Sequence, residues 1–156
     1  MIRHSCEFGD VSVTLDKIPI LAGLDDAALG LLRQGAIESK AEAGSVIVRE
    51  GEVGNRLFLI AEGSVRVCKH FSEPDEIELA RFYPGDFVGE MCILETLPRC
   101  ATILAVTDST LYSVTSMTFH HLYQDMPRQY SILVLNIARD LSRRLRHLDE
   151  LFAARH

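Results

Sequence analysis

Between Ala36 and Ser116 the sequence alternates short runs of β-branched and aromatic residues with glycine-bearing turns. In chain order the runs are SVIVRE, RLFLIAEG, SVRVCKH, IELARFY, FVGEM, ATILAV and TLYSVT. Five glycines lie between these runs or at their edges: Gly44, Gly51, Gly54, Gly63 and Gly85. Many short strands at this spacing are typical of a β-sandwich, roll or barrel. The segment FSEPDE around Pro74 is expected to be a solvent-exposed loop that joins two of the strands.

Helical segments are expected on both sides of this β region. Asp25 is an N-cap for a predicted helix from Asp26 to about Gln34 that ends at Gly35. After about Met117 a short helix precedes Pro127, which suits the first turn of a further helix. The chain therefore divides into a tail over 1–14, an N-terminal helical segment over 15–35, a β region over 36–116 and C-terminal helices over 117–156.

The last predicted helix carries apolar residues at alternating intervals of four and three. They are Val134, Ala138, Leu141, Leu145, Leu148 and Phe152. Such a heptad seam indicates helix pairing. We expect the first half of the helix to pack on the β region and the second half to pack on a partner helix, giving a homodimer through residues 134–152, because a lone projecting helix would expose these leucines to water. The alternative is that the whole seam packs on the chain's own body.

Composition and charge restrict the class of protein. The 156 residues are 47% hydrophobic and 24% charged, as expected for one globular domain. The net charge is −6, whereas nucleic-acid-binding proteins usually carry a surplus of basic residues. Residues 126–156 are modestly basic, with six arginines against three acids, which is too little to indicate DNA binding. No apolar run is long enough for a membrane span, and Met1–Asp10 has no apolar core of a signal peptide. We expect a cytoplasmic protein without membrane association.

Motifs for catalysis and metal binding are missing from the sequence. The four cysteines, Cys6, Cys68, Cys92 and Cys100, form no Cys-x-x-Cys pair and are interpreted as reduced thiols. There is no His-x-His, His-Glu-x-x-His, Gly-x-Ser-x-Gly, P-loop or Gly-x-Gly-x-x-Gly pattern. We therefore expect no catalytic residues, no metal site and no required cofactor.

The most informative stretch is Pro84–Thr102, PGDFVGEMCILETLPRCAT. Gly89 lacks a Cβ, so the backbone there can approach a ligand closely. Residues 90–95 suit a short helix, and the free amides at a helix N-terminus favour an anion. Glu90 stands at that same terminus. It either complements the helix dipole or accepts a hydrogen bond from a ligand hydroxyl.

Arg99 follows nine residues later, between two apolar runs. An arginine in such a place is costly unless it is paired. Its planar guanidinium suits two phosphate oxygens at once. The alternative interpretation is an internal salt bridge between Arg99 and Glu90.

Taken together, these residues resemble the phosphate-binding cassette of the cyclic nucleotide-binding domain family, of the catabolite-activator type. The family pattern is Phe-Gly-Glu, apolar residues, a short spacer, Pro-Arg, a small residue and Ala, and here it reads FVGEMCILETLPRCAT. IPILAGLDDAAL, AGSVIVREGEVGNRLFLIAEGSVRV and NIARDLSRRLR resemble other family segments, so the resemblance covers Leu15–Phe152. It implies a mainly β fold: an eight-stranded β-roll with a short N-terminal helix, a cassette helix and a long C-terminal helix that acts as lid and dimer seam.

The resemblance also implies roles for individual residues. Arg99 would clamp the cyclic phosphate. The main-chain amides of Cys92 and Ala101, or of neighbours such as Met91, would assist it.

The ribose and the walls of the site follow in the same way. Gly89 and Glu90 would hold the ribose 2′-hydroxyl. Val67, Leu79 and Val88 would form apolar walls, although the same residues also fit a plain hydrophobic core.

The base and lid positions involve the cassette and the last helix. Cys100 would lie near the base, and Arg144 matches a position that in some relatives reaches the base or the glutamate. Leu148 matches a position where relatives place a base-contacting polar residue. The alternative for Arg144 is a solvated helix face.

Two positions depart from the family pattern. Val88 stands directly before the glycine, where Phe is frequent. Cys100 stands where relatives selective for cGMP often carry Thr, and cysteine is a weak donor, which favours cAMP. Leu148 cannot hydrogen-bond adenine, which weakens that preference, so the choice between cAMP and cGMP stays open.

The resemblance to catabolite-activator-type regulators ends at the last helix. Those regulators continue into a winged helix-turn-helix, which the sequence to His156 does not contain. We expect a stand-alone ligand-binding module that does not bind DNA itself and acts through an unknown protein partner. One alternative is an effector domain of the oxygen-, haem- or nitric-oxide-sensing branches, although these branches usually lack the Glu–Arg pair. The other alternative is a structural interaction module that binds no nucleotide.

Overall fold

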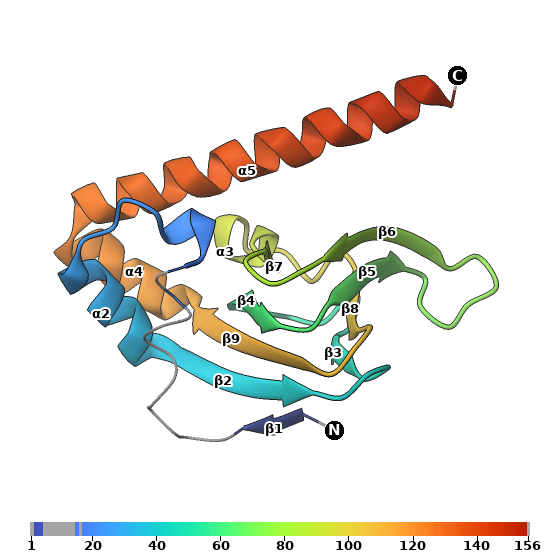
Figure 1. The fold of residues 1–156 in the computed structure, drawn as a ribbon, viewed down its shortest axis with the longest axis horizontal. Helices are drawn as coiled ribbons and strands as arrows, with labels where there is room; N and C mark the ends of the chain where they lie inside the picture. Colours follow the sequence, from blue (N-terminus) through green and yellow to red (C-terminus); the bar gives the residue numbers. More distant parts are fainter. Residues whose placement is uncertain (1, 5–14, 16, 156) are drawn as a thin grey trace.

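Two antiparallel sheets and a layer of helices make up the fold (Figure 1). The computed structural model describes residues 2–4, 15 and 17–155. One sheet has the strand order β1-β2-β9-β4-β7 and the other β3-β8-β5-β6. The strands are β1 (Ile2–His4), β2 (Ala36–Ala41), β3 (Val46–Val48), β4 (Arg56–Glu62), β5 (Val65–Lys69), β6 (Ile77–Phe82), β7 (Phe87–Val88), β8 (Thr102–Ala105) and β9 (Ser109–Thr115). The helices are η1 (Pro19–Leu21), α2 (Asp26–Gly35), α3 (Met91–Leu94), α4 (Ser116–Asp125) and α5 (Pro127–Ala154).

Strands β2 to β9 form the expected eight-stranded β-roll, which confirms the predicted fold class. Strand β2, with the sequence AIESKA, is not among the seven runs because Glu38, Ser39 and Lys40 interrupt any apolar pattern. Strand β1 pairs with β2 and lies in the segment expected to be a tail. The rest of that segment, residues 1 and 5–14 with Cys6, is outside the described residues.

Strand β4 separates the two hydrophobic cores, because successive side chains of a strand point to opposite faces. Leu57 and Leu59 face the helices, where they pack with residues of the N-terminal segment, α2, α4 and the first half of α5. Phe58 and Ile60 face the interior of the roll. The inner core contains Val48, Phe58, Ile60, Val65, Val88, Ile103 and Leu111.

The predicted helix boundaries agree with the structure. The Asp25 carboxylate accepts a hydrogen bond from the Ala28 amide at 2.8 Å and caps α2, which ends at Gly35. Pro127 occupies the first turn of α5. The side chain of Asn136 donates to the carbonyls of Ile20 (2.9 Å) and Ala22 (2.8 Å), which fixes α5 to the N-terminal segment.

The two halves of α5 differ in burial. Leu133 and Ile137 are buried in the helix-side core and Leu141 is partly buried against it. Leu145, Leu148 and Phe152 are 60%, 53% and 68% exposed. Leu145, Leu148 and Phe152 thus lie outside both hydrophobic cores of the described part of the chain, and in Figure 1 the last turns of α5 extend away from α2 and α4. None of the described helices is long and apolar enough to cross a membrane.

Candidate functional site

The stretch that resembles the cassette lies between β7 and β8. Val88 of β7 pairs with Phe58 of β4, and the chain then turns at Gly89, whose φ of +82° lies in the left-handed region that favours glycine. Glu90 is the N-cap of α3. The short helix predicted over 90–95 is thus observed over Met91–Leu94. Beyond α3 the chain passes Arg99 and enters β8.

Arg99 is a buried residue, with 7% of its surface exposed. Its Nη2 group donates to the main-chain carbonyl of Arg56 at 2.9 Å, and its Nη1 group donates to that of Gly89 at 3.3 Å. The guanidinium also lies 5.6 Å from the centre of the Phe58 ring. Main-chain carbonyls and a ring face orient the side chain but carry no full negative charge.

The charge of Arg99 has no counter-charge within the described part of the chain. No carboxylate there forms an ion pair with it, and its buried Nε has no hydrogen-bond partner. The internal Arg99–Glu90 salt bridge considered as an alternative is therefore not formed. A buried cation without a counter-charge is expensive, so this arrangement favours an anion beside Arg99.

Glu90 is buried, with 9% exposure. Burial raises the pKa of its carboxyl above the usual range, and the Asp140 carboxylate adds to this effect. A hydrogen bond from the residue's own main-chain N–H and the positive charges of Arg144 and Arg99 act in the opposite direction and lower the pKa of this carboxyl. The carboxyl therefore lies in the field of both arginines, one from the cassette and one from α5.

Arg144 connects α5 with the roll. Its guanidinium lies 4.3 Å from the ring centre of Phe87 and 4.5 Å from that of Phe82, and its Nη2 group donates to the Phe87 carbonyl at 2.9 Å. Its Nε is 2.6 Å from the Asp140 carboxylate. Arg144 is thus not on a solvated face, whereas the side chain of the adjacent Arg143 is 68% exposed.

The other residues singled out in the sequence fall into two groups. Val88 and Ala101 are buried, and Val67 is half-buried against the inner core of the roll. Leu79, Met91 and Leu148 are 48%, 49% and 53% exposed, and Cys100 is an exposed free thiol whose Sγ lies 3.6 Å from the Met91 sulfur. The main chain of Cys92 is part of α3.

Residues that the sequence analysis missed also contact the site. Arg56 contributes its carbonyl, Phe58 its ring, and Gly54 lies directly against the Arg99 guanidinium. In the sequence, Gly54 is noted only as a turn glycine, and Arg56 and Phe58 only as members of the strand run RLFLIAEG. Asp140 is one turn before Arg144 on α5 and could have been found as an i,i+4 ion pair.

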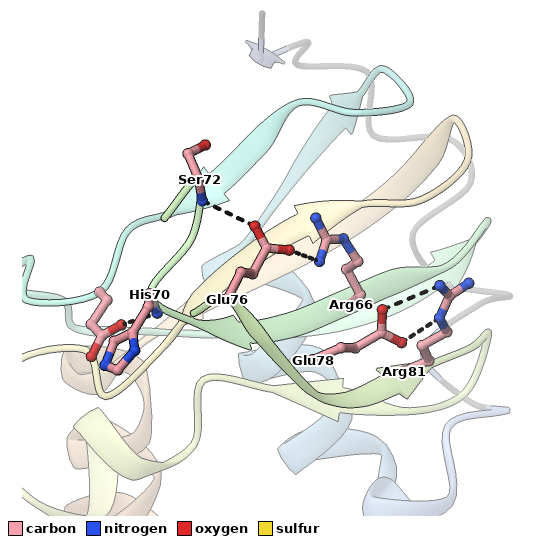
Figure 2. A network of polar contacts seen from close by, with 7 residues as sticks. Arg66, His70, Ser72, Glu76, Glu78 and Arg81 are labelled. Atoms are coloured by element: carbon pink, nitrogen blue, oxygen red, sulfur yellow. Dashed lines mark hydrogen bonds and ion pairs between the residues drawn. The ribbon is translucent and has the colours of Figure 1, made fainter. Parts of the chain in front are cut away.

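A polar network covers the β5–β6 hairpin beside the end of the cassette (Figure 2). Glu76 accepts from Arg66 at 2.6 Å and from the Ser72 amide at 3.0 Å, and Glu78 pairs with Arg81. The contacts of Glu76 attach the predicted loop around Pro74 to β5, but exposed ion pairs contribute little stability.

A third carboxylate, that of Glu50, links this hairpin to the cassette. Glu50 accepts from Lys69 at 2.7 Å and from the His70 amide at 3.2 Å, while its own amide donates to Thr102 Oγ1 at 3.0 Å.

The described residues contain no group of three or more His, Cys, Asp or Glu side chains that could hold a metal ion.

Known proteins are similar to this chain in sequence and in fold. The family model of the cyclic nucleotide-binding domain matches residues 38–126. A cyclic nucleotide-gated potassium channel of Mesorhizobium japonicum is 36% identical over 110 residues, which are 70% of this chain and 29% of the channel. The cyclic AMP receptor protein of Thermus thermophilus is 34% identical over 106 residues, which are 68% of this chain and 47% of that protein.

A solved structure extends the match to nearly the whole chain. The cyclic nucleotide-binding domain from Methylobacillus flagellatus has a TM-score of 0.85 over 99% of this chain and 89% of its own, at 19% identity, which shows a common fold. The chain spans less than half the length of the two sequence relatives. Because the family model covers more than half of its residues, the chain belongs to the cyclic nucleotide-binding domain family.

Proposed function

We propose that this protein is a regulatory module that binds a cyclic mononucleotide, with Arg99 against the cyclic phosphate. The observation that carries the proposal is the buried guanidinium of Arg99, which is oriented by two carbonyls and has no carboxylate partner among the described residues. A phosphate would supply the missing charge. The printed names of the two sequence relatives, a cyclic nucleotide-gated channel and a cyclic AMP receptor, support the same ligand class.

The remaining contacts are assigned by position. Gly89 and Glu90 hold the ribose 2′-hydroxyl, and the amides of Cys92 and Ala101, next to Met91, assist Arg99. Val67, Leu79 and Val88 line the apolar side. The exposure of Leu79 and the half-burial of Val67 fit residues that a ligand covers.

The base and the lid complete the proposal. Cys100 lies next to Arg99, and a thiol in place of a hydroxyl favours cAMP over cGMP. Arg144 and Leu148 of α5 belong to the lid. In this proposal the protein acts in the cytoplasm as a homodimer through residues 134–152 and relays nucleotide binding to a protein partner. It catalyses no reaction and requires no cofactor. It does not itself bind DNA or a membrane.

Calorimetric titration of the nucleotide-stripped protein with cAMP and with cGMP tests the proposal. We expect saturable binding of one or both, tighter for cAMP, and no comparable binding of 5′-AMP, which lacks the cyclic phosphodiester. A folded protein that binds neither cyclic nucleotide would overturn the proposed function. Tighter binding of cGMP would overturn only the preference for adenine.

A further inference from the structure

The main chain of Arg99 is held by the loop between β3 and β4. The Arg99 amide donates to the Glu52 carbonyl at 2.8 Å, and the Gly51 amide donates to the Arg99 carbonyl at 2.8 Å. These two hydrogen bonds fix the backbone of Arg99 against residues 51–56, which we call the clamp seat. The position of Arg99 therefore depends on the clamp seat as well as on the cassette, whose Gly89 carbonyl accepts from Nη1.

The clamp seat also touches the side chain of Arg99. The Arg56 carbonyl accepts from Nη2 at 2.9 Å, which fixes the far end of the guanidinium. Between the two ends lies Gly54. A Cβ on Gly54 would overlap Arg99 Nε and would come within 2.6 Å of Cζ and 2.7 Å of Nη2.

The backbone at Gly54 does not itself require glycine. Its φ is outside the left-handed region, in contrast to Gly51 (φ +84°) and Gly89 (φ +82°). An alanine could adopt the same backbone conformation, so the space for the guanidinium is what requires glycine at this position.

We propose that Gly54 is a positioning residue for nucleotide binding, since only a residue without a Cβ leaves room for the guanidinium of Arg99 against the clamp seat. The inference rests on the proposed function of Arg99. A methyl group at position 54 would push the guanidinium off its two carbonyl acceptors, and the cation would then miss the phosphate.

The test compares Gly54→Ala with two matched glycine substitutions. Gly35→Ala would overlap the Thr118 side chain, so it creates an equally tight contact in the helical layer, away from Arg99. Gly30→Ala has no atom within 4 Å of the new Cβ. We expect Gly54→Ala to weaken cAMP binding by about tenfold or more, as expected when a charge-assisted contact is misaligned. Both controls should bind within about twofold of the wild type.

A second measurement separates positioning from a general loss of structure. The two phosphorothioate diastereomers of cAMP present sulfur at different phosphate positions. If the guanidinium is displaced, Gly54→Ala changes the ratio of their affinities, whereas a merely loosened fold lowers both affinities equally. An unchanged ratio with unchanged cAMP affinity would overturn the inference while the wild-type titration still supports the proposed function.

A stability cycle tests the contact without any nucleotide. Gly54→Ala should lower the melting temperature in the wild-type background but not in the Arg99→Ala background, where the overlapping atoms are gone. If Gly54→Ala alone does not fold, restored folding of the double variant Gly54→Ala/Arg99→Ala supports the inference, and failure of the double variant overturns it. Wild-type protein that binds no cyclic nucleotide overturns the proposed function and, with it, the role of Gly54 in binding.

Discussion

Arg144 of the last helix and Phe87 of the roll are joined twice. The guanidinium donates to the Phe87 carbonyl at 2.9 Å and lies 4.3 Å from the centre of the same residue's ring. Phe87 is one residue before Val88 and two before Gly89, so the contact connects α5 directly to the strand that opens the cassette. We expect a movement of the cassette to act on the helix through this pair, as the proposed relay requires.

Arg144→Ala should loosen the attachment of α5. It removes a charged hydrogen bond and two cation–π contacts, and the loss should be about 1–3 kcal/mol. Hydrogen exchange of the amides in the second half of α5 should accelerate by about fivefold or more, because local opening becomes easier by that amount. Arg143→Ala, at an exposed neighbouring position, is the control and should leave exchange unchanged. Equal protection in both variants would contradict the role of Arg144.

Arg99→Ala should abolish most nucleotide binding. It would leave the phosphate charge without its partner in a buried site, at a cost of about 2–5 kcal/mol in binding free energy. Calorimetry should show a loss of at least about thirtyfold in affinity. A loss below about fivefold would mean that Arg99 does not contact the phosphate.

Glu90→Gln should change how stability depends on pH. Burial raises the pKa of Glu90 in the folded chain, so the folded state binds this proton more tightly than the unfolded state. The wild type therefore loses stability as pH rises from about 4.5, near the unfolded pKa, through the higher folded value.

The glutamine variant keeps the shape without the buried charge. Above this window its melting temperature should exceed that of the wild type, because the wild type then buries a charged carboxylate. Thermal unfolding between pH 4 and 8 measures the difference, and Glu95→Gln on an exposed position controls for the removal of one carboxylate. A difference that does not change over this range would contradict the assignment. The variant should also bind cAMP more weakly if Glu90 accepts from the ribose.

Leu145→Asp combined with Leu148→Asp should give a monomer if the proposed dimer forms through α5. Both leucines are more than half exposed, so neither supports the core of its own chain. Light scattering should show the mass falling by half at unchanged helix content. Leu141 is unsuitable for this test because it packs against the helix-side core. A dimer that persists in the double variant would place the interface elsewhere.

Local patterns predicted most of the fold. The caps of α2 and the start of α5 depend on single residues, Asp25 and Pro127, whose preferences act within a few positions along the chain. Strand β2 lies inside the predicted β region over 36–116 but is not among the seven runs, because its pairing with β9, and not its own composition, holds it in place. Its three successive polar residues interrupt the alternation of apolar and polar side chains that marks a half-buried strand.

The sequence indicates candidate residues for the site but not their contacts. Arg99, Glu90 and Gly89 could be identified because the cassette is contiguous in sequence. Their surroundings come from distant segments: Gly54 and Arg56 from one loop and strand, and Arg144 from α5. No spacing rule in one sequence indicates which glycine lies against a given arginine, so Gly54 became apparent only in three dimensions.

The hydrogen bond between Arg99 and the Arg56 carbonyl spans 43 residues of chain. Closing a loop of this length costs chain entropy, so we expect the contact to form later than the local strand pairings. A fragment that carries the cassette without residues 51–56 lacks this acceptor, so we expect it not to bind the proposed nucleotide. We expect binding of the proposed nucleotide to report that the cassette and the clamp seat have come together.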